Sequence, residues 1–200
     1  PLLGMRDAGL TLLLERLEPG RPLDAAAVDG AKRLQILGSL VARLHALSPP
    51  VNVAATGLAD YCLPWRAVLA EDPAALAELD ALLAGPAEEA LLHGDLHGGN
   101  ALEHGTGWVA IDPHAVWGDR HADIWALIDP RSPVLDSDPE AAISAIAAYA
   151  AAANLDPVRA RRWVRTRAAA EAALIAHGER PSADERAWGA RLRDLAAALA

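Results

Sequence analysis

The chain has 200 residues, 52% of them hydrophobic, which suits one domain of moderate size, or part of a larger one, with a packed core. Its net charge of −9 argues against nucleic-acid binding and suits a cationic ligand, although solubility alone explains most of these charges equally well. Cys62, the single cysteine, excludes an internal disulfide and a cysteine zinc cluster, and no apolar run approaches the ~20 residues that span a membrane. We therefore expect a cytoplasmic protein without a membrane partner.

The first third of the chain predicts a strand and a long helix. The apolar run at 10–14 indicates a buried strand, which residues 15–20 break. Asp24 is the expected N-cap of a helix that reaches about Leu47. We interpret His45, near the end of that helix, as a structural histidine. The apolar stripe of the helix consists of Leu34, Leu37, Leu40, Val41 and Leu44.

The middle of the chain predicts a loop and a second helix. Residues 51–64 are loop-like, with a short turn of helix near 58–62. Asp72 followed by Pro73 is typical of a helix start, and Gly85 ends that helix. A helical turn is expected at 87–90. The predicted buried face of the second helix consists of Leu76, Leu79, Leu82 and Leu83.

The last third of the chain is predicted to be helical. A helix is expected from near His121 to residue 127 or 128, followed by helices at 139–153, 157–177 and 183–200. Asp138 and Asp156, each followed by proline, are the expected caps of the first two of these three. The arginine-rich stretch 159–167 is interpreted as a solvated face.

Between these parts lies the stretch with the clearest chemistry. Residues 93–100 are HGDLHGGN, which is H-x-D-x-x-x-x-N, the spacing of a kinase catalytic loop. The acid is Asp95 and the amide is Asn100. A second acid, Asp112, follows twelve residues after Asn100.

The spacing of these residues predicts a metal site. Residues 101–103 and 108–111 are strand candidates, joined by a turn at 104–107. Closing this hairpin sets residue 100 opposite 111, only ~5 Å apart, so Asp112 returns beside Asn100. One carboxylate and one amide oxygen are hard ligands suited to Mg²⁺. Asp95, outside this pair, could accept the proton of an attacking hydroxyl.

The motifs HGDLH, GN, GW-x-AIDP and GDR with an aspartate three residues on resemble the aminoglycoside phosphotransferases. The resemblance is to their streptomycin/hydroxyurea resistance branch, and it is strong from about Leu91 to Pro130. It implies a protein-kinase-like fold that uses ATP and Mg²⁺ and a small cationic, hydroxylated acceptor. Asp95 would be the catalytic base, with Asn100 and Asp112 as metal ligands.

The same resemblance implies further roles. Glu15 and Leu17 occupy hinge positions that bind the adenine. Leu102 and Ile111 would form the floor of the adenine site. Asp123 is expected to hydrogen-bond the catalytic-loop backbone, a structural role that we also assign to His93. Trp117 and Asp119 are candidates for contacting the acceptor, with loop bracing as an equal alternative.

Three alternatives stay open. A ketoamine kinase of the fructosamine type also fits HGDL-x-GGN and the GDR segment. A dinuclear metal hydrolase could use the acids Asp95 and Asp112 with several histidines, although it leaves Asn100 without a role. A non-catalytic kinase fragment is the third. The histidines available to the hydrolase are His93, His97, His114 and His121.

The expected architecture is an α+β, mostly helical C-terminal lobe around the hairpin, without most of the N-terminal lobe. Residues 1–20 would be the end of an N-lobe strand and the hinge, and residues 21–200 the helical lobe. Lys32, the only lysine, lies on a helix after the hinge, where it cannot contact the ATP phosphates. The chain begins with Pro1, and about fourteen residues precede the hinge. We expect weak Mg·ATP binding by this chain alone, slow or absent transfer, and an exposed strand at 10–14.

Overall fold

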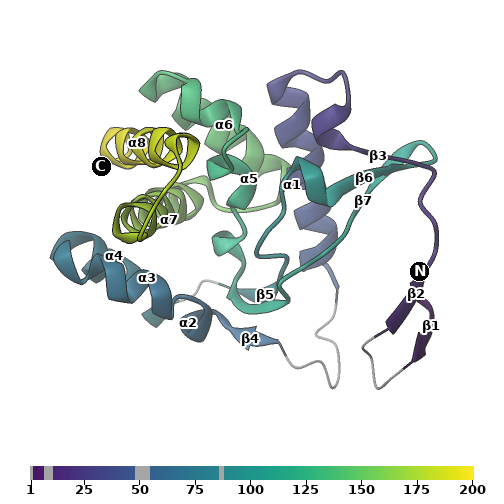
Figure 1. The fold of residues 1–200 in the computed structure, drawn as a ribbon, viewed down its shortest axis with the longest axis horizontal. Helices are drawn as coiled ribbons and strands as arrows, with labels where there is room; N and C mark the ends of the chain where they lie inside the picture. The colour runs from purple at the N-terminus through teal and green to yellow at the C-terminus, as the bar shows by residue number, and fades with distance from the viewer. Residues whose placement is uncertain (1, 7–10, 48–54, 86–87) are drawn as a thin grey trace.

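The computed structural model describes residues 2–6, 11–47, 55–85 and 88–200. Within these residues the protein is mostly helical and contains three small sheets (Figure 1), which agrees with an α+β fold. None of the described helices is by itself long and apolar enough to cross a membrane, although α6 (Pro139–Ala152) and α7 (Pro157–His177) together pass that test as a pair bent by 119°.

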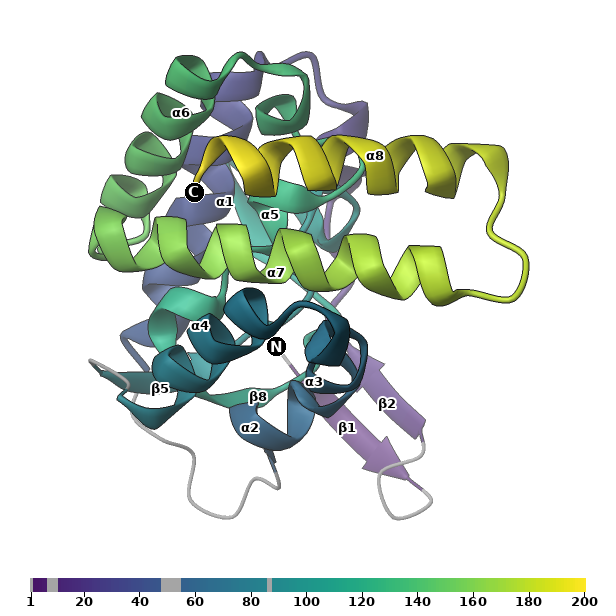
Figure 2. The ribbon, with the colours of Figure 1, turned by 90° about the vertical axis from the view of Figure 1, so that its left-hand side faces the viewer.

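The first sheet is a hairpin set apart from the helical body (Figures 1 and 2). Its strands are β1 (Leu2–Arg6) and β2 (Thr11–Leu14), which pair antiparallel with each other and with none of the other described strands. Residue 10 of the expected strand lies outside the described residues. Leu13 and Leu14 are 63% and 57% exposed. The buried strand predicted from the apolar run is therefore wrong, whereas the exposed strand expected for a chain without most of the N-terminal lobe is found.

The second sheet contains the predicted hairpin. Strands β6 (Ala101–His104) and β7 (Gly107–Ala110) pair antiparallel, with Glu103 opposite Trp108 as expected. β3 (Pro19–Pro22) adds a third strand along β6. Beyond the last strand pair, the Ile111 N–H donates to the Asn100 carbonyl at 2.9 Å, so the chain returns beside Asn100.

The third sheet corrects a helix prediction. Of the expected helical turn at 87–90, residue 87 is not described, Glu88 lies in a bend, and the last two residues begin strand β5 (Glu89–Leu92). β5 pairs antiparallel with β8 (Val116–Asp119), and β4 (Thr56–Gly57) pairs with β8 on its other side. The helical propensity of Glu and Ala is a weak preference, and pairing with β8 overrides it.

Helix α1 (Gly30–His45) begins later than predicted. Its N-cap is Asp29, whose side chain accepts the Lys32 N–H at 2.7 Å. Asp24 lies upstream, in the short 3-10 helix η2 (Leu23–Ala25), so its prediction as the cap is wrong. The predicted apolar stripe is buried from Leu34 to Val41.

The central helices follow the predicted starts. α2 (Leu58–Tyr61), α3 (Leu63–Val68) and the 3-10 helix η3 (Leu69–Glu71) lead into α4 (Pro73–Ala84). Asp72 caps α4, as predicted, by accepting two backbone N–H groups. Leu79 and Leu82 are fully buried, whereas Leu76 and Leu83 are only partly buried.

The C-terminal third of the chain is helical, as predicted. Instead of one helix from His121, the chain forms the 3-10 helix η5 (Arg120–Ala122) and then α5 (Trp125–Ile128). After η6 (Pro133–Asp136) come α6 (Pro139–Ala152), α7 (Pro157–His177) and α8 (Ala183–Ala198), with Asp138 and Asp156 as the predicted caps. α7 and α8 lie side by side and face the viewer in Figure 2.

Candidate functional site

The loop between β5 and β6 carries the predicted catalytic residues. It starts at His93 and ends in the 3-10 helix η4 (Gly98–Asn100). The buried Asp123 accepts the His93 N–H at 2.9 Å and the Gly94 N–H at 3.0 Å, which are the hydrogen bonds that the resemblance implied. His45 lies 3.2 Å from the same carboxylate, which confirms a structural role for His45.

The environment of Asp123 favours its carboxylate form. Burial alone would raise its pKa. The hydrogen bond and positive field from His45 and the N–H groups of His93 and Gly94 outweigh burial, so the pKa lies below its usual value. At neutral pH a carboxylate charge thus holds two consecutive loop amides.

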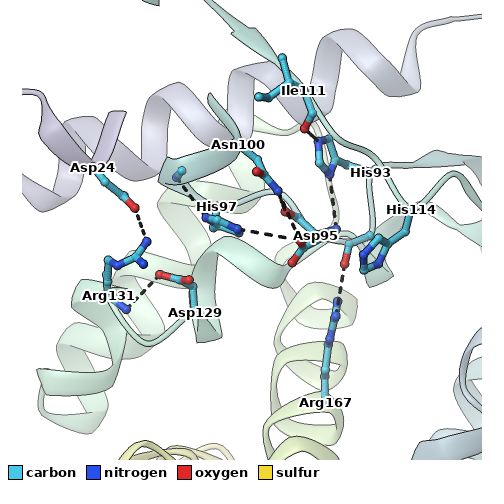
Figure 3. Close-up of polar contacts among 12 residues, drawn as sticks. Asp24, His93, Asp95, His97, Asn100, Ile111, His114, Asp129, Arg131 and Arg167 are labelled. Atoms are coloured by element: carbon cyan, nitrogen blue, oxygen red, sulfur yellow. Dashed lines mark hydrogen bonds and ion pairs between the residues drawn. The ribbon is translucent and has the colours of Figure 1, made fainter. Parts of the chain in front are cut away.

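Asp95 follows directly on this clamped segment and is partly exposed. Asn100 donates from its side-chain amide to the Asp95 carbonyl at 3.0 Å and to Asp95 Oδ2 at 3.3 Å. His97 Nε2 lies 3.8 Å from the same carboxylate oxygen (Figure 3). The carboxylate is therefore oriented by its own loop while remaining accessible to a reactant.

His93 connects this loop to the residue before Asp112. The His93 ring donates from Nε2 to the Ile111 carbonyl at 2.9 Å, because a carbonyl oxygen can only accept. Its Nδ1 accepts the Asp95 N–H at 3.4 Å, and burial lowers the pKa of His93. A neutral ring with both nitrogens engaged suits support of the backbone rather than proton transfer.

Asp112 itself adopts a left-handed backbone with φ of 58°. Such angles are uncommon outside glycine, although aspartate and asparagine tolerate them best, and they cluster at functional sites. Asp112 is exposed. Hairpin closure brings it next to Asn100 in the chain path, so a carboxylate and an amide oxygen come from neighbouring segments.

A cavity of about 930 Å³ adjoins Asp112. It brings together residues from 14–20 and 102–113, two segments that lie far apart in the sequence. The apolar side chains of Leu17, Leu102 and Ile111 line it together with Glu15. All four residues predicted to contact adenine therefore share one cavity with a predicted metal ligand.

The two residues proposed to contact an acceptor lie elsewhere. Asp119 is 2% exposed and accepts from Arg159, Trp163 and the His121 ring. These contacts agree with the bracing alternative for Asp119. Trp117 lies in strand β8 and donates to Glu89 at 3.1 Å.

A dinuclear hydrolase is not supported. His121 is held between Asp119 and the Asp156 N–H, and the His93 ring is committed to the backbone. Within the described ranges, no group of three or more histidine, cysteine or acidic residues is arranged to hold a metal ion. The ring nitrogens of His93 and His121 are thus engaged in structural contacts, which weakens the argument for that alternative.

Two features of the loop were not predicted. Asp24 forms ion pairs with Arg33 and Arg131, and a Cβ at Gly98 would lie only 1.9 Å from Asp24 Oδ1. Asp24 thus packs directly on the glycines of the loop.

The second feature is Arg167, which reaches the loop from α7 (Figure 3) and contradicts the interpretation of 159–167 as a solvated face. A polar residue at a helical core position was the only sequence signal for it.

Comparison with known proteins agrees with this geometry. A family model described as aminoglycoside/hydroxyurea antibiotic resistance kinase matches residues 1–178. The chain belongs to this family. It is 36% identical over 169 residues to streptomycin 3''-kinase of Klebsiella pneumoniae, covering 76% of this chain and 62% of that protein. It is also 36% identical over 137 residues to streptomycin 6-kinase of Streptomyces glaucescens, covering 60% of this chain and 43% of that protein.

A solved structure shares the fold of this family member. An aminoglycoside phosphotransferase of Streptomyces rimosus, determined in complex with ADP and streptomycin, superposes with a TM-score of 0.51 at 23% identity. The match covers 72% of this chain and 64% of that one. The chain thus spans between 43% and 62% of the two curated relatives and a similar share of the solved structure.

Proposed function

We propose that this chain is the catalytic part of a kinase that transfers the γ-phosphoryl of ATP to a hydroxyl of a streptomycin-like aminoglycoside. The observation that carries the proposal is the cavity lined by Asp112. The residue before Asp112 is hydrogen-bonded to the Asn100 backbone, and the Asn100 side chain in turn donates to Asp95. The names of the two curated relatives support this acceptor class. The net charge of −9 is compatible with a cationic acceptor.

Asp95 is the proposed catalytic base. Its carboxylate would accept the proton of the acceptor hydroxyl as that oxygen attacks the γ-phosphorus in line. Asn100 keeps the carboxylate in one direction, and the Asp123 clamp fixes the backbone before it. Orientation of this kind accounts for much of the rate enhancement when the chemistry needs no covalent intermediate.

The residues present fit Mg·ATP. The amide oxygen of Asn100 and the carboxylate of Asp112 are hard oxygen donors of the kind Mg²⁺ prefers. The cavity lined by Leu17, Leu102 and Ile111 offers apolar surfaces for a purine. When bound, Mg²⁺ would neutralise charge on the transferring phosphates.

We further infer that residues 1–20 form the end of an N-lobe strand and the hinge, and that residues 21–200 form the helical lobe of a kinase-like fold. We also propose that the protein is cytoplasmic. Lys32 lies on α1 and donates to Gln35 at 3.0 Å, away from the cavity residues. Since kinases of this fold place a lysine on the α/β-phosphates, the 200-residue chain alone should bind Mg·ATP weakly and turn over slowly.

The test is product formation by this chain at high protein concentration. The protein is incubated with Mg·ATP and, separately, with streptomycin, other aminoglycosides and a fructosamine, and phosphorylated product is detected by mass spectrometry. Streptomycin should be phosphorylated slowly. Asp95→Ala should reduce the rate by about 10²- to 10⁴-fold while leaving nucleotide binding intact.

The matched control is Asp138→Ala, which removes the exposed cap of α6, a residue outside the loop. It should leave product formation unchanged. Equal product from the wild type and Asp95→Ala would refute the assignment of the base. Phosphorylation of the fructosamine alone would move the proposal to the ketoamine kinases.

A further inference from the structure

Arg167 is a buried cation on α7, behind the loop that carries Asp95. It is only 4% exposed. Its guanidinium carbon lies 4.5 Å from the ring centroid of Trp125 and 4.9 Å from that of Trp65, with Tyr61 at 6.0 Å. A planar guanidinium stacks on aromatic faces in a way that an ammonium group does not. Helices α3 and α5 thus supply an aromatic setting suited to arginine.

The guanidinium is directed at one backbone group of the loop. Arg167 Nη2 donates to the Gly94 carbonyl at 3.2 Å, and the Tyr61 hydroxyl donates to the same oxygen at 3.4 Å. That carbonyl belongs to the peptide unit joining Gly94 to Asp95. Its orientation therefore sets the direction in which the Asp95 side chain leaves the backbone.

The loop needs such a restraint at this point. Gly94 has φ of +79°, and a Cβ there would lie 3.1 Å from the Cβ of His114, so the position favours glycine. Glycine also leaves the backbone most free to rotate. The N–H of Gly94 is held by Asp123 from one side and its carbonyl by Arg167 from the other.

A purely local ion pair does not explain this arrangement. Glu171, one turn further along α7, lies 3.6 Å from Arg167 Nε, too far for a hydrogen bond. Burial raises the pKa of Glu171, and the neighbouring Arg167 opposes that rise. The shortest hydrogen bond of the guanidinium goes to the loop, 73 positions away.

We infer that Arg167 is a positioning residue that fixes the Gly94–Asp95 peptide and so aims the Asp95 carboxylate. α7 would then act as a rigid support for the loop. The inference rests on the proposed function in taking Asp95 as the base. The restraint on the peptide itself does not depend on activity and can be measured separately.

The test compares Arg167→Lys and Arg167→Met with Arg159→Lys. Arg159 lies on the same helix and is also largely buried, donating to Asp119 at 2.7 Å and to the Leu82 carbonyl at 2.9 Å. Hydrogen exchange of the backbone amides at 93–96 is followed by mass spectrometry, with turnover per folded molecule and affinity for Mg·ATP measured in parallel.

Both Arg167 variants should exchange about 10- to 100-fold faster at 93–96, the factor expected when a hydrogen bond from a charged donor is lost. Turnover should fall by about 10²-fold in Arg167→Met and by less in Arg167→Lys, with nucleotide affinity unchanged. Arg159→Lys should change neither the amide exchange at 93–96 nor the turnover. If Arg167→Met does not fold, Arg167→Lys carries the comparison.

The outcomes separate the two claims. Exchange at 93–96 that matches the wild type, or that rises only as much as in the rest of the chain, would overturn the positioning role. If the wild type makes no product but exchange rises locally in the Arg167 variants, the restraint stands and the proposed function fails.

Discussion

Asn100 donates its side-chain amide to Asp95, with 3.3 Å between Nδ2 and Oδ2. The same nitrogen lies 3.0 Å from the Asp95 carbonyl. With the nitrogen committed to these acceptors, the amide oxygen is the atom left to meet a cation. One side chain thus serves both the proposed base and the proposed metal site.

Asn100→Ala should therefore affect two measurements. Loss of the restraint on Asp95 should lower turnover by about 10²-fold. Loss of an oxygen ligand should raise the Mg²⁺ concentration needed for half-maximal nucleotide binding in a calorimetric titration. Asp95→Ala is the matched comparison, since it should lower turnover alone. An Mg²⁺ requirement identical to that of the wild type would argue against Asn100 as a ligand.

Asp112 should show the opposite pattern to Asp95. Asp112→Asn keeps a residue that tolerates the left-handed backbone but removes the charge, so it should weaken Mg·ATP binding with little change in stability. Asp112→Ala should weaken binding as much and also lower the unfolding free energy by about 1 kcal/mol through backbone strain. Calorimetry and urea unfolding measure the two effects. Retained Mg·ATP affinity in Asp112→Asn would remove this residue from the metal site.

Asp123 should make stability depend on pH. Its pKa is lowered in the folded state because the hydrogen bonds to its carboxylate outweigh burial, so its stabilising contribution is full above the unfolded value of 3.8 and is lost as the pH falls below it. Asp123→Asn should cost roughly 3–5 kcal/mol at pH 7 and less in acid. Urea unfolding followed by tryptophan fluorescence, at pH 7 and at a pH below 3.8, measures the difference in the free energy of unfolding.

The control for that experiment is Asp138→Asn, at the exposed cap of α6. Asparagine caps helices about as well as aspartate, so this change should be nearly neutral at pH 7. A stability loss in Asp123→Asn that is the same in acid as at neutral pH would show that the carboxylate charge is not what holds the loop.

Cys62 should react only when the protein unfolds. Its side chain is fully buried, and burial raises its pKa to about 12, with Arg167 and Arg66 opposing the rise. Since the thiolate is the reactive form, labelling of the folded protein should be slower than that of the unfolded chain by about 10³-fold or more. The labelled fraction in a urea series should follow the unfolded fraction from fluorescence. Rapid labelling in buffer would mean that α3 opens locally.

The hairpin of β1 and β2 should promote self-association. Leu3, Met5 and Leu13 are each more than 60% exposed on a two-stranded sheet that pairs with no other described strand. Exposed apolar strands of this kind are sites of aggregation. Leu13→Lys should reduce self-association in sedimentation velocity. Leu47→Lys is the control, because Leu47 is 61% exposed but lies outside any strand. An equal effect of both would attribute the association to net charge.

Much of the site could be predicted from the sequence because its rules are local. The hairpin register from Ala101 to Ala110 follows from a short turn and a side-chain period of two. Asp72, Asp138 and Asp156 cap their helices through N–H groups two or three residues away. Local constraints of this kind are enough to bring the segment of Asp112 back beside the loop that holds Asp95 and Asn100.

The tertiary structure decided the contacts that join distant segments. Asp24 was an acceptable helix cap by its sequence, yet it pairs with Arg131, 107 positions away. The sequence left Asp119 with two equal roles, acceptor contact or loop bracing, and in the fold Arg159 and Trp163, 40 and 44 positions on, donate to its carboxylate. Arg167 looked solvated until α3 and α5 stacked aromatic rings on it. Local propensities are worth a fraction of a kcal/mol per residue, whereas burial of a charge costs several unless distant partners compensate it, so only the assembled fold determines where these residues lie.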